Sequence, residues 1–235
     1  MTFAAITGCI SKKELDAFFP DAGVDWITLQ RVPAADAYPG VTAWFDLDYT
    51  NERQRNEALS RLFPALVIVD AVTPTIGEIG YPFVRLNGWP GWPELAVHEL
   101  AAPDEATAQR ITALYTQLGH AFRLVPDTPG MISPRILATI INEAWYTWEE
   151  KVSTKEEIDT AMRLGTNYPL GPFEWGERIG LDRIFQLLSS LGTIEPRYAP
   201  CEAMRTEVAA QRTEGAAGSA PRLRRGGAGR RLQSD

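Results

Sequence analysis

The chain has 235 residues, 45% of them hydrophobic, so it can form one large or two small domains with a buried core. It carries a formal net charge of −7 and has no apolar run of the roughly 18 residues that a membrane span needs. An acidic chain does not attract nucleic acid, so we predict neither a nucleic-acid nor a membrane partner. Without a signal-peptide pattern, and with only the distant Cys9 and Cys201, we expect a cytoplasmic protein with free thiols.

The first 125 residues alternate short apolar runs with helical patterns. Each run has strand length and is flanked by turn residues; the runs are 3–7, 24–29, 43–47, 65–69, 83–86, 95–100 and 121–125. Helical patterns follow Ser11 and cover 52–62 and 104–118. Alternating strands and helices predict an α/β domain whose parallel sheet is covered on both faces in a Rossmann-like order.

From Gly130 onward the strand signals stop and helices are predicted instead. They cover 131–150, a segment from the N-cap Thr154 to Gly165, then 173–179 and 181–191. The sequence therefore predicts an α/β domain followed by an all-α domain. We place the domain limits at 1–128 and 129–205, with a tail over 206–235.

The predicted tail is rich in Gly, Ala and Arg and has few large apolar side chains. Such a segment cannot bury enough surface to offset the entropy lost on ordering, so we predict disorder over 206–235. Six Arg against two acidic residues lie between 212 and 235, so the rest of the chain is more acidic than the net charge suggests. A tail that binds RNA or anionic lipid, and a read-through extension, are the alternatives.

Short motifs follow one another between 126 and 182. They are P-D-T-P-G-M-I-S-P-R at 126–135, N-E-A at 142–144, I-D-x-A at 158–161, P-x-G-P at 169–172 and G-L-D at 180–182. In this order they resemble the junction and helical domain of the 3-hydroxyacyl-CoA dehydrogenase family. The resemblance implies a Rossmann domain joined to a helical domain of the 6-phosphogluconate-dehydrogenase C-terminal type. It also implies a homodimer formed through the helical domain.

The same resemblance places the family's catalytic residues. A histidine after the strand at 83–86 takes the hydroxyl proton while hydride passes to NAD, and a glutamate twelve residues later orients it. These positions fall on Asn87 and Glu99. An amide has no useful basicity near neutral pH, so we expect Asn87 to be inactive as a base. The substrate-binding asparagine of the junction is replaced by Pro134, which leaves Ser133 as the candidate hydroxyl.

His98 and His120 are the two histidines of the chain, and we predict a structural or surface role for both. Neighbouring residues in a strand point to opposite faces, so His98 faces away from any site that Glu99 faces.

The cofactor motif is reduced. A Rossmann fingerprint, G-x-G-x-x-G, lets bare backbone approach a pyrophosphate at a helix N-terminus. Only Gly8 of this pattern is present, followed by the helix cap Ser11. The second strand ends at Gln30, where an acidic residue for the adenosine ribose is expected. Gly8, Ser11 and Gln30 are thus weak candidates for binding NAD, and no metal site is predicted.

Aromatic residues gather in two places. The segment N-G-W-P-G-W-P at 87–93 fits a hydrophobic wall for an acyl chain or pantetheine arm, and equally a loop packed on the helical domain. Trp145, Trp148, Phe173 and Trp175 fit a dimer interface and equally a core.

Three functions remain open. The main prediction is a family member with weak or lost catalysis that binds an acyl-CoA-like ligand or a partner subunit. The first alternative is an active NAD-dependent 3-hydroxyacyl-CoA (3-hydroxybutyryl-CoA) dehydrogenase of fatty acid metabolism with a rearranged site. The second is a purely structural or assembly protein.

Overall fold

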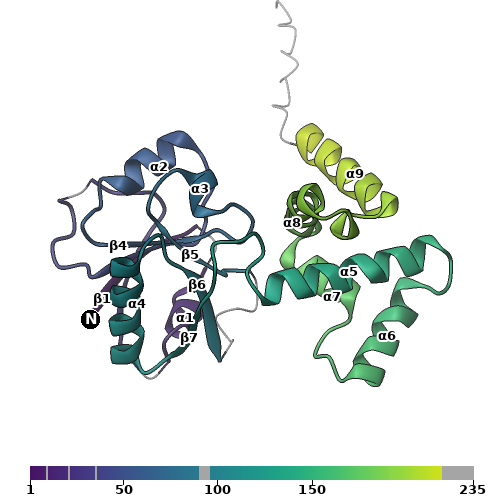
Figure 1. Ribbon diagram of the computed structural model, residues 1–235, viewed down its shortest axis with the longest axis horizontal. Coiled ribbons are helices and arrows are strands. Elements are labelled where there is room, and N and C mark those ends of the chain that lie inside the picture. Colours follow the sequence, from purple (N-terminus) through teal and green to yellow (C-terminus); the bar gives the residue numbers. More distant parts are fainter. Residues whose placement is uncertain (9, 21, 35, 90–95, 219–235) are drawn as a thin grey trace, which may run out of the picture.

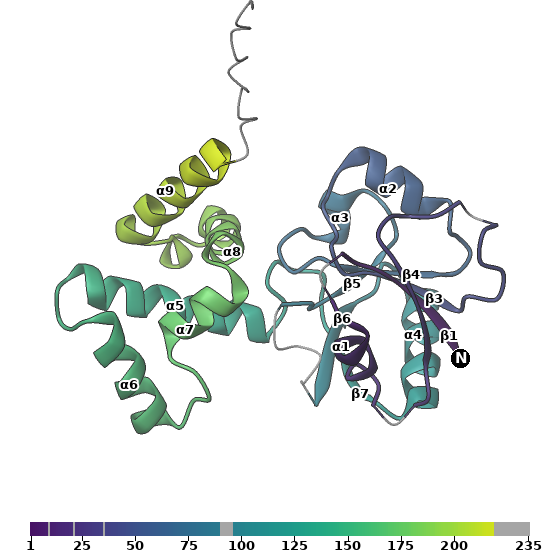
Figure 2. The ribbon, with the colours of Figure 1, turned by 180° about the vertical axis from the view of Figure 1, so that it is seen from behind.

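The computed structural model of the protein describes residues 1–8, 10–20, 22–34, 36–89 and 96–218. A sheet domain that contains the N-terminus lies beside a helical domain, and helix α5 (Ser133–Glu149) runs from the joint to the far end of the helical domain (Figures 1 and 2). None of the helices in the described ranges is long and apolar enough to cross a membrane.

The sheet domain contains one seven-stranded sheet in the order β2-β1-β3-β4-β5-β6-β7. The strands are β1 (Thr2–Ile6), β2 (Asp25–Leu29), β3 (Ala43–Asp46), β4 (Leu66–Asp70), β5 (Val84–Leu86), β6 (Val97–Ala101) and β7 (Ala121–Leu124). Because β2 and β3 lie on opposite sides of β1, the topological switch point falls between β1 and β3, where α/β sheets bind ligands.

Helices cover both faces of this sheet. Helices α1 (Lys12–Asp16) and α4 (Glu105–Leu118) pack on the face that carries Phe3 and Ala5. Helices α2 (Arg53–Ser60) and α3 (Ile76–Ile79) pack on the other face, which carries Ala4 and Ile6. Burial on both faces explains why β1, β3 and β4 read as continuous apolar runs rather than alternating ones. The α/β prediction is confirmed.

The sheet differs from the prediction at one pair of strands. β6 runs antiparallel to β5, with Leu86 opposite Leu100, whereas every other neighbouring pair is parallel. Parallel neighbours need a crossover of a dozen or more residues, and only residues 87–96 separate β5 from β6. The described residues between β2 and β3 also contain no helix, so this edge of the domain is smaller than a full dinucleotide-binding half.

The helical domain follows as predicted, with two corrections. It contains α5, α6 (Lys155–Thr166), α7 (Pro172–Ile179), α8 (Leu181–Ile194), a short 3-10 helix η2 (Pro196–Tyr198) and α9 (Glu202–Gly218). Helix α6 does not end at Gly165: its C-cap is Asn167, whose φ of 56° is a left-handed conformation that asparagine tolerates.

The second correction concerns the tail. Helix α9 reaches Gly218, so the predicted start of disorder at 206 is wrong. Cys201, Met204 and Val208 are buried in the helical core at helical spacing, and this apolar stripe holds the helix against the domain. Residues 219–235 lie outside the described residues, as do residues 90–95 of the Trp- and Pro-rich segment.

Candidate functional site

Three residues predicted as catalytic candidates meet where the two domains join. Asn87 follows β5, Glu99 lies on β6 and Ser133 opens α5. The Asn87 Nδ2 atom donates to Ser133 Oγ at 3.2 Å. The Glu99 carboxylate accepts the backbone N–H groups of Ile132 and Ser133 at 2.9 and 3.0 Å.

Glu99 acts as the missing cap of α5. The helix has no capping side chain of its own, because its N-cap residue is Ile132, and Pro134 in the first turn has no N–H to satisfy. A carboxylate is favoured at this positive end of the helix dipole. Glu99 is 8% exposed, and both its oxygens already accept backbone donors. It therefore stabilises the joint between the domains.

The amide of Asn87 is also fixed by neighbouring groups. The side chain is 3% exposed, its nitrogen donates to Ser133, and its oxygen accepts the backbone N–H of Trp89 at 3.3 Å. Its backbone N–H donates to the carbonyl of Glu99 at 3.1 Å. A neutral amide held in this way has no lone pair of useful basicity for a hydroxyl proton.

Neither histidine faces this site. His98 is 1% exposed and lies among Phe18, Phe19 and Tyr115, with its Nδ1 atom 3.2 Å from the Tyr115 hydroxyl. The ring of His120 lies against it, with 4.0 Å between ring centroids. Burial, and secondarily repulsion from His120, lowers the pKa of His98 to about 3. This histidine pair belongs to the core on the α1/α4 face.

The cofactor candidates lie at the end of β1. The backbone N–H of Gly8 donates to Oδ2 of Asp48, and the Thr7 hydroxyl donates to Oδ1 of the same carboxylate at 3.4 Å. Ser11 and Glu14 form a reciprocal cap, with the Ser11 N–H 2.8 Å from Glu14 Oε2. Gln30 lies exposed beyond β2.

This turn does not fit the pyrophosphate of NAD. Of the described donors in this turn, the N–H groups of Gly8 and Ser11 already bind the carboxylates of Asp48 and Glu14, and these negative charges repel the two charged phosphates of NAD. The sequence reasoning missed Asp48 because it follows β3, forty residues from Gly8. Among the described residues, no group of three or more His, Cys, Asp or Glu side chains is arranged to hold a metal ion.

Two further buried charges that were not predicted from the sequence, Asp70 and Arg85, lie near the joint between the domains. Asp70, at the end of β4, accepts the N–H of Gly88 at 3.1 Å and lies 3.6 Å from Arg183 of α8. Burial raises the pKa of Asp70 to about 6, while Arg183 opposes the shift. A Cβ atom at Gly88 would overlap the Asp70 side chain, so only glycine fits there.

Arg85 is fully buried in the middle of β5. It donates to the carbonyls of Ala71 and Val72 at 2.9 and 2.8 Å and to the Asp127 carboxylate at 2.6 Å. Asp127 also accepts the N–H of Ile76 at 2.9 Å. The first acidic residue of the junction motif therefore fixes the path of the chain between the domains. The sequence did hold one indication of this buried ion pair, because Arg85 interrupts an otherwise apolar strand.

The motifs of the helical domain hold its helices together. Asp159 accepts the N–H groups of Phe173 and Glu174 at 2.8 and 3.2 Å and so caps α7. Gly171 fits beside it because a Cβ atom there would overlap Asp159. Asn142 donates to the carbonyl of Ala199 at 3.0 Å and accepts the N–H of Cys201 at 3.1 Å, which joins α5 to the start of α9. These signature residues encode structure rather than chemistry.

A Rossmann-like sheet domain followed by a helical domain defines the two-domain class of dehydrogenase folds. Residues 130–221 match the family model described as 3-hydroxyacyl-CoA dehydrogenase, C-terminal domain. The helical part of this chain is therefore similar to the C-terminal domain of the 3-hydroxyacyl-CoA dehydrogenase family.

Curated proteins that are similar to this chain carry the names of 3-hydroxyacyl-CoA dehydrogenases. The 3-hydroxyadipyl-CoA dehydrogenase of Escherichia coli is 45% identical over 105 residues, which are 44% of this chain and 22% of the relative. A probable 3-hydroxybutyryl-CoA dehydrogenase of Bacillus subtilis is 39% identical over 111 residues, which are 46% of this chain and 39% of the relative. The chain therefore matches less than half the length of these curated relatives.

Solved structures show the same fold. The (S)-3-hydroxybutyryl-CoA dehydrogenase PaaH1 from Ralstonia eutropha superposes with a TM-score of 0.66 at 25% identity, covering 80% of this chain and 70% of that one. The 3-hydroxybutyryl-CoA dehydrogenase of Escherichia coli K12 gives a TM-score of 0.54 at 33% identity, covering 63% of this chain and 32% of that one.

Proposed function

We propose that this chain is a family member without dehydrogenase activity that works by association through its helical domain. The observation that carries the proposal is Asn87, which stands where the resemblance expects the catalytic histidine. Its amide is held by Ser133 and Trp89, and the adjacent Glu99 carboxylate is used as a helix cap. Neither histidine takes the place of the base beside Asn87, because His98 and His120 belong to the core on the α1/α4 face.

The β1–α1 turn supports the same proposal. Hydride transfer requires a bound nicotinamide coenzyme, and the Asp48 carboxylate already accepts the Gly8 N–H that would bind the pyrophosphate. Asn87 stands at the position of the base, and the Asp48 carboxylate binds the backbone donor at the position of the coenzyme. A rearranged but active dehydrogenase would need the coenzyme site open and a base positioned at the substrate hydroxyl.

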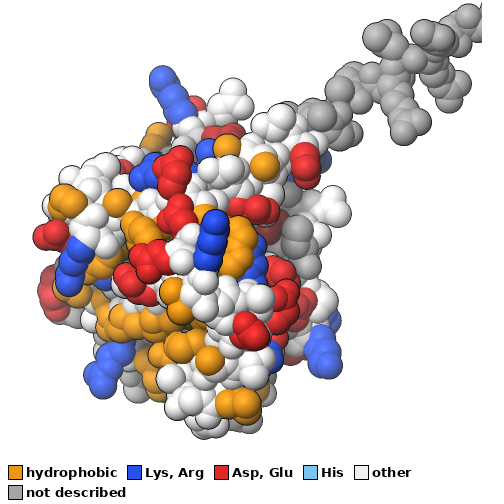
Figure 3. Space-filling view, turned by 90° about the vertical axis from the view of Figure 1, so that its right-hand side faces the viewer, with side chains coloured by type: hydrophobic (Ala, Val, Ile, Leu, Met, Phe, Trp, Pro, Cys, Tyr) orange, Lys and Arg blue, Asp and Glu red, His pale blue; other side chains and the backbone are white. Residues whose placement is uncertain are grey.

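The proposed association surface is an apolar groove between α5 and α6. It has a volume of about 500 Å³ and is lined mainly by Ile140, Ala144, Ile158, Ala161 and Met162. A band of hydrophobic side chains is exposed at this end of the molecule (Figure 3).

Two large side chains extend this surface. Ile136, one turn before Ile140 on α5, is 57% exposed, and Leu164 on α6 is 83% exposed. Exposed apolar patches of this kind mark interaction sites. We propose a second copy of the chain as the occupant, because family members dimerise through this domain. A cytoplasmic location stays part of the proposal.

The activity is tested with acetoacetyl-CoA and NADH, by following the absorbance of the reduced nicotinamide. We expect no turnover above the uncatalysed rate, and rates in the ordinary enzymatic range would overturn the proposal. Calorimetric titration with acetoacetyl-CoA then separates a protein that retains an acyl-CoA ligand from one that serves assembly alone.

The association is tested by analytical ultracentrifugation of the full chain. We expect a concentration-dependent dimer that Leu164→Glu converts to monomer, because a charge cannot be buried unpaired in an apolar interface. Leu124→Glu, at an exposed leucine of β7, is the matched control and should leave the dimer intact. A monomeric wild type, or equal effects of the two variants, would contradict the proposed surface.

A further inference from the structure

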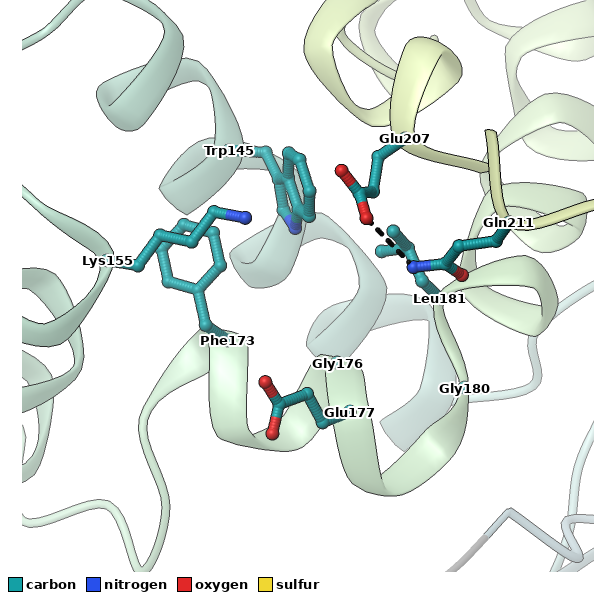
Figure 4. A pocket seen from close by; sticks show the side chains of 9 residues that line it. All are labelled: Trp145, Lys155, Phe173, Gly176, Glu177, Gly180, Leu181, Glu207 and Gln211. Atoms are coloured by element: carbon teal, nitrogen blue, oxygen red, sulfur yellow. Dashed lines mark hydrogen bonds between the residues drawn. The ribbon is translucent and has the colours of Figure 1, made fainter. Parts of the chain in front are cut away.

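A cavity of about 300 Å³ lies wholly within the helical domain (Figure 4). Its lining residues come from α5, α6, α7, α9 and the turn that starts α8, and none comes from the sheet domain. The volume is at the lower end of the range for small-molecule sites. The cavity is therefore separate from the joint that contains Asn87 and Glu99.

One wall of this cavity contains a buried hydrogen-bond donor without an acceptor. Trp145 is 4% exposed, and its indole N–H has no hydrogen-bond partner among the described residues. The nitrogen lies on the side of the ring that faces the middle of the cavity (Figure 4). Buried polar groups nearly always have a partner, so an unpaired donor at a cavity wall points to an acceptor supplied from outside.

A second donor lies beside the first. The Nζ atom of Lys155 is 4.4 Å from the ring centroid of Trp145 and 4.3 Å from that of Trp148, so its charge rests on two indole faces. In the described part of the chain this ammonium forms no salt bridge. Its N–H groups can therefore donate hydrogen bonds to a ligand. Lys155 is only partly buried, and its side chain can move to admit a ligand.

The facing side of the cavity carries the opposite charge. Glu177 of α7 and Glu207 of α9 both line it, and Glu207 accepts a hydrogen bond from Gln211 at 3.0 Å. Figure 4 shows these carboxylates across the cavity from the Lys155 ammonium. Phe173 and Leu181 supply apolar parts of the lining.

We propose that this cavity binds a small zwitterion, of the size of an amino acid, that carries one carboxylate and one ammonium group. The ligand carboxylate accepts from the Trp145 indole and the Lys155 ammonium. The ligand ammonium lies near Glu177 and Glu207, and a short apolar side chain contacts Phe173. A ligand with a negative charge only would face the carboxylates of Glu177 and Glu207 and the single ammonium of Lys155. A ligand with a positive charge only would leave the Trp145 N–H without an acceptor. Neither kind of ligand complements the lining. The inference is independent of the proposed loss of dehydrogenase activity.

The test is a screen of the twenty L-amino acids against the full chain by ligand-observed NMR, followed by calorimetry of those that bind. We expect saturable one-to-one binding of at least one amino acid. Lys155→Met and Trp145→Phe should each weaken it about tenfold, because each removes a hydrogen bond to a charged group while keeping apolar bulk. Lys13→Met, at an exposed lysine of the sheet domain, is the matched control and should leave the affinity unchanged.

Three results would overturn the inference. They are no binding of any amino acid up to about 10 mM, equal binding of propionate or methylamine, and an affinity that Lys155→Met does not change. If Trp145→Phe fails to fold, Glu177→Gln at the exposed carboxylate supplies the second variant, with an expected loss of about threefold or more.

Discussion

Glu99 is a strand residue that caps the first helix of the helical domain. It accepts two backbone N–H groups at the start of α5 and so holds the helical domain against the sheet. Glu99→Gln removes the charge and one acceptor oxygen, and should lower the free energy of unfolding by about 1–3 kcal/mol. Urea denaturation at pH 7 measures this loss. Glu150→Gln, at an exposed glutamate after α5, is the control, and equal losses in the two variants would contradict the capping role.

His98 gives a pH dependence at the same scale. Its pKa is about 3 in the folded protein, against about 6.5 in the unfolded chain, so the unfolded chain takes up the proton first. The stability it contributes is complete above pH 6.5 and falls as the pH drops from 6.5 toward 3. Between pH 7 and pH 5 the wild type should lose about 2 kcal/mol more than His98→Gln. Parallel stability profiles of the two proteins between these pH values would refute the assignment.

At the scale of single elements, α7 depends on a cap from another helix. Asp159 of α6 accepts the N–H groups of Phe173 and Glu174, and Gly171 leaves room for the carboxylate. Asp159→Ala should destabilise the protein by about 2 kcal/mol, the upper range for loss of an N-cap. Glu156→Ala, at an exposed residue of the same helix, is the control for helix α6 itself. Thermal unfolding measures the stability of both variants, and equal losses in Asp159→Ala and Glu156→Ala would contradict the capping role of Asp159.

Elements were predictable from sequence where local chemistry specifies them. Thr154 and Ser11 cap their helices as the sequence indicated, because the capping hydrogen bonds involve residues close in the chain. The direction of β6 was not predictable from its apolar run, since a buried strand has the same composition in either direction. Helix α9 was missed because only Met204 and Val208, with Cys201 just before the helix, mark its buried side within a sequence of small and polar residues.

The candidate site was predictable only in part. Spacing along the chain located Asn87, Glu99 and Ser133, and the fold brings them within hydrogen-bond distance. Asp48 and Asp70 were not found, because they reach the site through the parallel pairing of β1, β3 and β4. Contacts between residues forty positions apart leave no local sequence pattern.

On the scale of the whole molecule, two buried carboxylates of the sheet domain connect it to the helical domain. Glu99 caps α5, and Asp70 lies opposite Arg183 of α8. A dehydrogenase of this architecture uses the space between its domains for substrate and coenzyme. Here polar groups of the chain bind one another where the two domains meet.

The most direct test of this account is titration of the full chain with NADH, followed by calorimetry, because a dehydrogenase must bind its coenzyme before any chemistry can occur. We predict no saturable binding up to about 1 mM, since the Asp48 carboxylate occupies the Gly8 donor and repels the pyrophosphate. Micromolar binding of NADH to the wild type that competes with NAD would contradict the central claim.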